Sequence, residues 1–309
     1  MPMKPVMLLM GACLAAVCQA ASVASTEFLD NVTLQVLLDR AGFSCSAIDG
    51  AWGRKSQVAL ATYCAVKGIA VPGKVSEARK LLFGSEPVPF TFNVVSAAEH
   101  AELVRIPASP EGKAALRTMG YETIQEMYAE RGHLSEAALR RLNPSLAWPN
   151  PPAGAVVKLP DFRRSAQVES SARANVLRVS LQRREITVFD AAGRLLLLLP
   201  CSIAADKDKL PPPGEILVTT MVPKPNYTYT PDFVPRGEKV VKRIFPPGPN
   251  CPVGAVWIGL SLPGYGIHGT PKPEQIGRAE SHGCFRLANW NARRLYDVCD
   301  TGVAVVVEN

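Results

Sequence analysis

The C-terminal part of the chain, from Val176 onward, changes to an apolar pattern with a period of two. This pattern predicts short strands separated by turns such as Asp190–Gly193. We expect strands at residues 176–181, 186–189, 195–199, 215–220, 255–260 and 303–307. A single late helix is expected at 289–298, from the spacing of its apolar residues. The combination predicts a mostly β domain, sandwich- or barrel-like, over residues 170–309.

The N-terminal part carries helical patterns instead. In residues 27–86, Thr33 is expected to cap a helix that ends at Gly42. A second helix is expected at 56–67 with Gly68 as its stop, after a glycine-bearing loop at 47–53. The region is therefore predicted to be a small helical module.

Residues 91–161 mix both kinds of element. A strand is expected near residues 90–95, and helices at 122–131 and 136–142, the second capped by Ser135 and stopped at Asn143-Pro144. Another strand is expected at 154–159. This middle module is predicted to be α+β, and the polar stretch 163–174 a linker.

Length and charge exclude some classes of protein. A chain of 309 residues favours two or three domains. The formal charge of +7 is spread thinly, with no run of basic residues, which argues against a nucleic-acid partner. No apolar run is long enough to predict an integral membrane span.

Residues 1–20 have the pattern of a secretory signal peptide. Lys4 supplies the charge, a short apolar run follows, and Cys18-Gln-Ala20 places small residues where a signal peptidase cleaves. The protein is therefore expected to be exported to the periplasm or cell wall. A lipoprotein acylated at Cys13 or Cys18 is the less favoured alternative.

One stretch near the C-terminus combines residues suited to nucleophilic catalysis. His268, His282 and Cys284 lie within seventeen residues and are flanked by glycines. A cysteine is reactive near neutral pH when a histidine can take its proton. His268 precedes Cys284 by sixteen positions, so it reaches the thiol only if the chain doubles back. His282 and Cys284 would share one side of a strand, and Gly283 leaves room for an oxyanion at nearby backbone N–H groups. Spacing alone allows either histidine to be the base.

The run Ile267-His-Gly-Thr270 followed by Ser281-His-Gly-Cys284-Phe-Arg286 resembles the signature of the L,D-transpeptidase catalytic domain. The resemblance covers roughly residues 174–308. It implies a cell-wall enzyme that forms 3→3 peptidoglycan crosslinks through a thioester on Cys284 and needs no cofactor or metal. Its implied partners are peptidoglycan stem peptides and glycan, with the oligomeric state left open.

Carried over by position, the resemblance makes His268 the base and the carbonyl of Gly269 the group that orients its ring. His282, Gly283 and Ser281 would shape the oxyanion or substrate site. Arg286 would fix the loop or a substrate carboxylate.

The two N-terminal regions also resemble wall-binding modules. Gly42-Phe, Ile48-Asp-Gly50 and Trp52-Gly53, with the helices around them, resemble the three-helix peptidoglycan-binding module over 27–86. The helix, helix, Asn-Pro, strand order within 91–161 resembles a LysM carbohydrate-binding module. His100 and His133 are expected to be inert surface residues.

Export makes disulfides possible. Cys45 and Cys64 are the favoured pair, because both fall in one small module. Cys201 with Cys251, or Cys251 with Cys299, are further possibilities between which the sequence does not choose.

Five alternatives remain. The three residues of the motif could be part of a zinc site, or Cys284 a buried structural cysteine. The same fold could instead act as an L,D-carboxypeptidase or attach proteins to peptidoglycan. The whole chain could also be a non-catalytic wall-binding protein.

Overall fold

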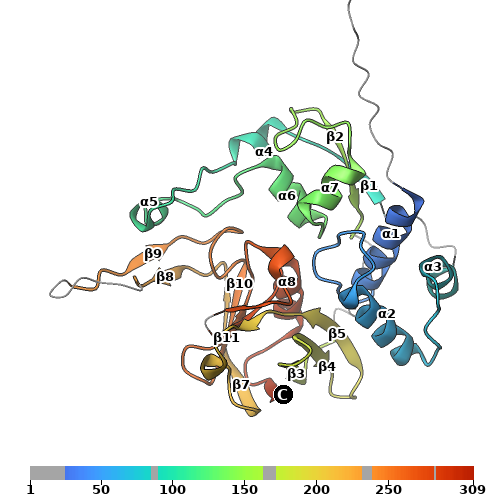
Figure 1. Ribbon diagram of the computed structural model, residues 1–309. Coiled ribbons are helices and arrows are strands. Elements are labelled where there is room, and N and C mark those ends of the chain that lie inside the picture. The colour runs from blue at the N-terminus through green and yellow to red at the C-terminus, as the bar shows by residue number, and fades with distance from the viewer. Residues whose placement is uncertain (1–24, 85–89, 163–171, 232–238, 282) are drawn as a thin grey trace, which may run out of the picture.

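The computed structural model describes residues 25–84, 90–162, 172–231, 239–281 and 283–309. The predicted signal peptide and both cysteines considered for acylation lie outside these ranges. No helix among the described residues is long and apolar enough to cross a membrane. Figure 1 shows the N-terminal helices in blue, the middle module in green and the C-terminal domain in yellow to red.

Three helices form the N-terminal module: α1 (Thr26–Arg40), α2 (Arg54–Lys67) and α3 (Val75–Phe83). The predicted start of the first helix at Thr33 is wrong. The helix begins seven residues earlier, because the hydroxyl of Ser25 accepts a hydrogen bond from the Phe28 N–H at 3.3 Å and caps it. Thr33 is instead buried within the helix. The predicted stop at Gly68 is confirmed by its left-handed conformation.

The loop between α1 and α2 is held by Gln35. Its side-chain nitrogen donates to the carboxylate of Asp49 and to the carbonyl of Ala51, each at 3.0 Å. Its side-chain oxygen accepts from the Gly50 N–H at 2.9 Å. Gly50 has φ +72°, and a Cβ there would lie 2.1 Å from the Phe28 ring, so the turn requires glycine.

The middle module is α+β, as predicted. Strands β1 (Phe90–Val94) and β2 (Val156–Pro160) pair antiparallel. Between them lie α4 (Ala97–Ala101), α5 (Pro110–Ala114), α6 (Ile124–Arg131) and α7 (Glu136–Leu142). The end of α7 is joined to β2 by the Asn143 side chain, which accepts from the Lys158 N–H at 2.7 Å and donates to its carbonyl at 3.0 Å. Whether this is a LysM module stays a prediction.

The N-terminal and middle modules share one hydrophobic core, a feature that the sequence analysis did not anticipate. Phe28 and Val32 of α1 pack in the same cluster as Tyr128 and Leu139 of the middle module. These side chains expose 2% or less of their surface. Burial of this apolar surface stabilises the association, so the two regions form one packed unit.

The C-terminal domain contains an eight-stranded sheet, which confirms its mostly β character. The strand order is β13-β11-β10-β7-β14-β3-β4-β5. In chain order these strands are β3 (Val176–Ser180), β4 (Glu185–Phe189), β5 (Leu195–Pro200), β7 (Gly214–Pro223), β10 (Val256–Leu260), β11 (Gly266–His268), β13 (Phe285–Arg286) and β14 (Ala304–Glu308). Two smaller sheets pair β6 (Ile203–Ala204) with β12 (Ala279–Ser281) and β8 (Tyr227–Tyr229) with β9 (Arg243–Phe245). Two 3-10 helices lie at Lys207–Lys209 and Pro273–Gln275.

The two edges of the large sheet approach each other. Ser202, just after β5, forms a bridge with Arg286 of β13. The Ser202 N–H donates to the Arg286 carbonyl at 2.9 Å, and the Arg286 N–H donates back at 3.0 Å. The sheet is therefore curled towards a barrel, and the segment that holds Cys284 lies at the point where its edges meet.

Helix α8 (Asn289–Val298) has the bounds that the sequence predicted. Ala292, Leu295 and Val298 pack into the core of the C-terminal domain with the buried strand residues. The other side of α8 faces the two N-terminal parts, since Trp290 packs against Ala47.

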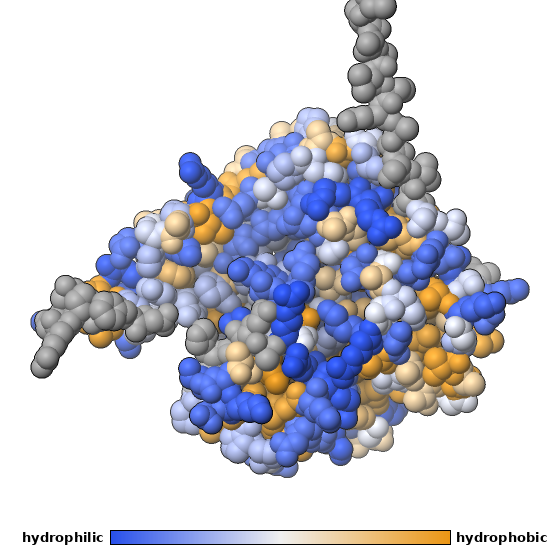
Figure 2. All heavy atoms as spheres, viewed as in Figure 1, coloured by the Kyte–Doolittle hydropathy of each residue, from blue (hydrophilic) through white to orange (hydrophobic). Residues whose placement is uncertain are grey.

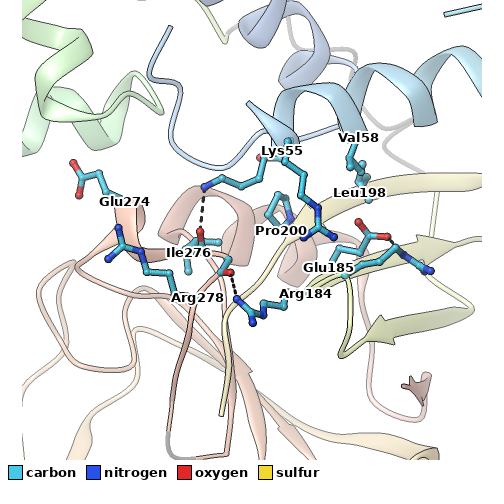
Figure 3. A pocket seen from close by; sticks show the side chains of 13 residues that line it. Lys55, Val58, Arg184, Glu185, Leu198, Pro200, Glu274, Ile276 and Arg278 are labelled. Atoms are coloured by element: carbon cyan, nitrogen blue, oxygen red, sulfur yellow. Dashed lines mark hydrogen bonds and ion pairs between the residues drawn. The ribbon is translucent and has the colours of Figure 1, made fainter. Parts of the chain in front are cut away.

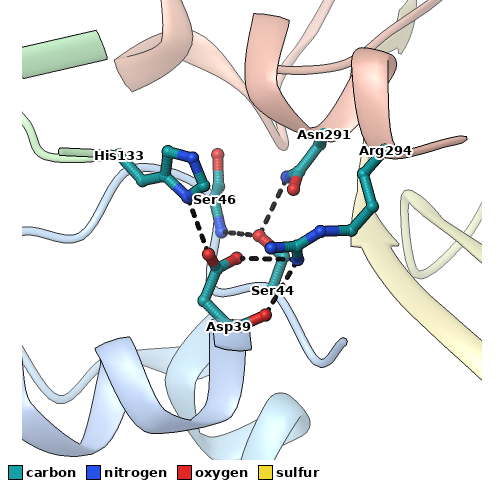
Figure 4. A network of polar contacts seen from close by, with 6 residues as sticks. All are labelled: Asp39, Ser44, Ser46, His133, Asn291 and Arg294. Atoms are coloured by element: carbon teal, nitrogen blue, oxygen red, sulfur yellow. Dashed lines mark hydrogen bonds and ion pairs between the residues drawn. The ribbon is translucent and has the colours of Figure 1, made fainter. Parts of the chain in front are cut away.

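A buried polar network joins all three parts of the chain (Figure 4). Asp39 of α1 accepts from the His133 ring at 2.7 Å and from Arg294 of α8, whose Nη1 also lies 2.8 Å from the Asp39 carbonyl. The His133 ring stacks on Phe162 and on Trp290. The prediction that His133 is an inert surface residue is therefore wrong, because its partners come from distant parts of the chain.

The predicted disulfide between Cys45 and Cys64 is not formed. Both thiols are free and buried in the same apolar cluster. Of the remaining described cysteines, Cys201, Cys251 and Cys299 are free as well. Burial raises the pKa of the Cys45 thiol to about 12, with Asp39 adding to the effect, so Cys45 is held as a neutral thiol in the core.

Candidate active site

His268 and the segment of Cys284 lie on neighbouring strands. Strand β11 pairs antiparallel with β10 and parallel with β13. In this register His268 lies opposite Trp257 on one side and Arg286 on the other. Residues paired across strands point to the same face of a sheet. The chain has doubled back between His268 and Cys284, as the sequence analysis required.

The two faces of these strands have different roles. Ile258, Ile267 and Phe285 are fully buried in the core of the domain. Trp257, His268 and Arg286 alternate with them and lie on the opposite face. Cys284 is two positions before Arg286, one strand away from His268. Ideal strand geometry, with a spacing of about 4.8 Å and a rise of about 3.3 Å per residue, puts a strand residue at this position about 8 Å from the His268 Cα, and Cys284 itself lies in a bend just before β13.

The His268 ring is fixed by three contacts. Its Nδ1 lies 2.6 Å from the carbonyl oxygen of Gly269, and its ring stacks on Trp257 at 5.6 Å between centroids. The side chain is buried, with 5% of its surface exposed. An Nδ1–H that donates to this carbonyl leaves Nε2 as the unprotonated nitrogen. The tautomer is thus the one that a general base needs.

Burial also determines the charge of this ring. Loss of solvent lowers the pKa of His268 to about 4, although the hydrogen bond to Gly269 opposes the effect. The positive charge of Arg286 lowers it further. His268 is therefore neutral at pH 7 and free to accept a proton.

Gly269 is required by packing as well as by this hydrogen bond. A Cβ at Gly269 would lie 2.1 Å from Oδ1 of Asn289. That oxygen accepts from the Ala255 N–H at 3.0 Å, and Nδ2 of Asn289 donates to Glu130 at 2.8 Å. Asn289 is fully buried and joins the backbone beside His268 to the middle module. Asn289 was not predicted as a site residue, because its local pattern indicates only the first residue of a helix.

Cys284 is a half-buried cysteine. Its Sγ lies 3.6 Å from the carbonyl oxygen of Gly264. Burial raises the pKa of the thiol, while a hydrogen bond from the Gly266 backbone and the charge of Arg286 oppose the rise. The resting site therefore pairs a neutral thiol with a neutral imidazole.

Gly283 precedes the cysteine in a conformation that favours glycine, with φ +146°. A Cβ there would lie 3.3 Å from Cε1 of Tyr265. The Tyr265 hydroxyl donates to the carbonyl of Lys209 at 3.0 Å, which fixes the ring beside the glycine. Tyr265 therefore limits the room at the cysteine turn, a role that the sequence analysis did not assign.

The backbone of Arg286 forms two hydrogen bonds with the backbone of Ser202. Its side chain borders a cavity of about 610 Å³. Its Nε is buried and has no hydrogen-bond partner among the residues that the structure describes. A buried donor without a partner is costly, and a ligand carboxylate would satisfy it.

This cavity is lined by the middle module as well as by the C-terminal domain. Glu122, Gln125 and Glu126 face Thr270 and Arg286 across it. On the face shown in Figure 2, hydrophilic residues predominate where the middle module meets the C-terminal domain. The contribution of the middle module could not be found from local sequence patterns.

Two predicted site residues remain without side-chain detail. Ser281 ends strand β12, which pairs with β6, and His282 lies outside the described residues. Among the described residues no group of three or more metal-ligating side chains occurs. Because His282 belongs to the proposed zinc set, that alternative stays untested.

A neutral histidine on the strand next to a cysteine is an arrangement used in cysteine-dependent acyl transfer. The comparison with protein families agrees with this class. Residues 174–307 match the YkuD family model, the L,D-transpeptidase catalytic domain. The C-terminal domain of this chain therefore belongs to the L,D-transpeptidase catalytic domain family.

Individual relatives carry the same description. The chain is 29% identical to the putative L,D-transpeptidase YkuD of Bacillus licheniformis over 186 residues, which are 60% of this chain and 93% of the relative. It is 34% identical to the putative L,D-transpeptidase YqjB of Bacillus subtilis over 34% of this chain and 57% of the relative.

Solved structures with local similarity include an L,D-transpeptidase from Mycobacterium smegmatis, at 17% identity and a TM-score of 0.35. That alignment covers 50% of this chain and 64% of the other. L,D-transpeptidase 3 of Mycobacterium tuberculosis, in complex with a faropenem-derived adduct, aligns at 16% identity and a TM-score of 0.36. It covers 50% of this chain and 65% of the other.

Proposed function

We propose that this protein is a cell-wall L,D-transpeptidase that forms 3→3 peptidoglycan crosslinks through a thioester on Cys284. The observation that carries the proposal is the hydrogen bond from His268 Nδ1 to Gly269, because it leaves Nε2 as a base on the strand next to the thiol. The family of the C-terminal domain supports the substrate class.

In the first half-reaction the Cys284 sulfur attacks the carbonyl carbon that precedes a terminal D-alanine. His268 Nε2 takes the thiol proton as the C–S bond forms. Since the pKa of His268 is about 4, the imidazolium gives this proton up readily. The proton passes to the nitrogen of D-alanine, the C–N bond breaks, and a thioester remains on Cys284.

In the second half-reaction the side-chain amine of another stem peptide attacks the thioester. His268 removes a proton from this amine, the C–S bond breaks, and the sulfur takes the proton back. One amide bond has replaced another, so no oxidant, metal or cofactor is consumed. In both halves the negative oxygen is stabilised by backbone N–H groups near Cys284.

Arg286 and the cavity beside it bind the donor peptide in this proposal. The buried Nε of Arg286 would pair with a carboxylate of the stem peptide. The carboxylates of Glu122 and Glu126, on the middle-module side of the cavity, would attract an incoming amine. The middle module would then help to select substrates whether or not it binds glycan.

Such a reaction requires export, so residues 1–20 would be removed as a signal peptide and the mature chain would act in the periplasm or cell wall. Cell fractionation with an antibody against the C-terminal domain checks this. Recovery of the full-length, uncleaved chain in the cytoplasm would contradict it.

The decisive experiment incubates the purified chain from residue 25 with tetrapeptide muropeptides and analyses the products by mass spectrometry. We expect 3→3 crosslinked dimers and release of D-alanine, both absent in Cys284→Ala. Tripeptides without dimers would assign an L,D-carboxypeptidase instead. Loss of activity in His282→Ala but not in His268→Ala would reverse the assignment of the base.

A further inference from the structure

A second cavity, of about 300 Å³, lies away from the candidate active site, between α2 and the C-terminal domain (Figure 3). Its walls come from the start of α2, the turn between β3 and β4, and the loop after the 3-10 helix at 273–275. The site described above does not use any of these walls.

The lining of this cavity is strongly basic. Five cationic side chains border it: Arg54, Lys55, Arg183, Arg184 and Arg278. Only two carboxylates, Glu185 and Glu274, accompany them. Arg183 already pairs with Glu185 at 2.5 Å. Five positive charges against two negative ones leave an excess of three in a small space, and such an excess attracts anions.

The start of α2 adds to the positive potential. Its first two residues are Arg54 and Lys55, its first turn contains no acidic residue, and Gly53 offers no side-chain cap. Cations at a helix N-terminus oppose the helix dipole, and acidic residues are normally preferred there. This arrangement costs stability unless an anion occupies the cavity.

The backbone of the β3–β4 turn is also held in an unusual conformation. Arg184 has φ +57°, a left-handed conformation that a non-glycine residue adopts at some cost. In this conformation its Nη1 donates to the Gly277 carbonyl at 2.8 Å. The strain is therefore found at the residue that turns a guanidinium towards the cavity.

Two of the cations hold one loop. Lys55 Nζ donates to the Ile276 carbonyl at 3.1 Å, one residue before the carbonyl that Arg184 binds. This loop leads directly into β12 and then to the segment of Cys284. Loss of solvent lowers the pKa of Lys55, and the nearby Arg278 lowers it further, while Asp49 and the Cys45 thiol oppose this.

We propose that this cavity is a binding site for a multiply charged oxyanion, held by the guanidinium groups of Arg54 and Arg183 and by the N-terminus of α2. Carboxylates of a peptidoglycan stem peptide and free phosphate share the required chemistry. An anion bound here neutralises the repulsion among the cations and stiffens the loop that Lys55 and Arg184 hold. A role in wall recognition rests on the proposed function, whereas oxyanion binding does not.

The test uses the purified chain from residue 25 in two arms, inorganic phosphate and citrate, with sodium chloride at matched ionic strength as the reference. Calorimetric titration gives the dissociation constant, and thermal unfolding gives the shift in Tm. The variants are Arg54→Gln and Arg183→Gln. Arg105→Gln, which removes an exposed arginine of the middle module outside the cavity, is the matched control.

We expect a saturable rise in Tm with at least one anion, and a dissociation constant roughly tenfold weaker in each of the two cavity variants but unchanged in Arg105→Gln. Binding of citrate alone assigns the site to carboxylates, and binding of phosphate alone assigns it to phosphate. No saturable binding, or equal binding by all variants, would overturn the proposal. Muropeptide crosslinking is assayed in the same samples, so that failure of the proposed transpeptidase activity can be told apart from failure of the anion site. A protein that forms no crosslinks but still binds citrate, with weaker binding in Arg54→Gln, would support the anion site and not the proposed activity.

Discussion

The charge state of the Cys284–His268 pair can be tested through the pH dependence of thiol alkylation. Many reactive cysteines exist as a thiolate beside an imidazolium at neutral pH. Here burial moves the two groups in the opposite sense, since it raises the pKa of the thiol above its ordinary value and lowers that of the ring to about 4. The resting pair is then neutral over the whole interval between these values.

The expected pH dependence of the alkylation rate follows from the raised pKa of the Cys284 thiol. Because burial raises the pKa of Cys284 above that of an ordinary thiol, only a small fraction of it is thiolate at pH 7. The rate of alkylation by iodoacetamide should therefore rise about tenfold per pH unit from 6 to 9, with no plateau in between. Because a neutral ring contributes little to the charge at the sulfur, His268→Gln should leave this profile nearly unchanged while it abolishes crosslinking.

The assay follows Cys284 labelling by mass spectrometry in the intact protein, and Cys284→Ser gives the background from the buried thiols. A rate that reaches its plateau near pH 6, and that loses this plateau in His268→Gln, would show an ion pair at rest. That result would refute the argument from burial.

Four further outcomes follow from the contacts. In the unfolded chain the His268 ring binds a proton below about pH 6.5, but in the folded protein only below about pH 4. The free energy of unfolding should therefore fall by about 3 kcal/mol as the pH drops from 6.5 to 4. Urea unfolding at several pH values should show that the His268→Gln variant lacks this decrease. Burial alone would raise the pKa of Asp39, but Arg294 and His133 lower it to about 2. The ionised carboxylate therefore stabilises the folded protein by about 2 kcal/mol above pH 3.8, and this contribution is lost as the pH falls towards 2. Acid titration of the unfolding free energy should show that the Asp39→Asn variant lacks this loss. Gly269→Ala should lower the free energy of unfolding by several kcal/mol and abolish activity, because the added Cβ would collide with Asn289. Gly73→Ala is the control, since a Cβ at Gly73 would meet open space, and it should change neither the Tm nor the activity. Arg286→Lys should raise KM for muropeptides about tenfold with little change in Tm, and an unchanged KM would remove Arg286 from substrate binding.

Local patterns were sufficient for many elements. The bounds of α7 and α8, the cap at Ser135 and the strands β3, β4 and β5 agree with the prediction to within about a residue. These features depend on near neighbours, through capping hydrogen bonds and alternating burial. The start of α1 was missed because the apolar residues before Thr33, such as Phe28 and Val32, make their contacts with another module.

The candidate site residues could also be chosen from the sequence, since a cysteine, two histidines and their glycines occur together in one stretch. The electrostatics of the site could not be predicted, because the pKa of His268 depends on burial and on Arg286 across a parallel strand pair. The role of Asn289 and the part of the cavity lined by the middle module could not be predicted either, because both depend on contacts between distant parts of the chain.

What the sequence alone determined is therefore the set of local elements and the reactive residues they carry. The tertiary structure alone decided the shared core of the first two modules, the place of His133 among α1 and α8, and the basic cavity beside α2. These features join residues that are about a hundred or more positions apart. Such contacts arise from the packing of whole faces and from charges brought together on folding, and neither leaves a pattern in neighbouring residues.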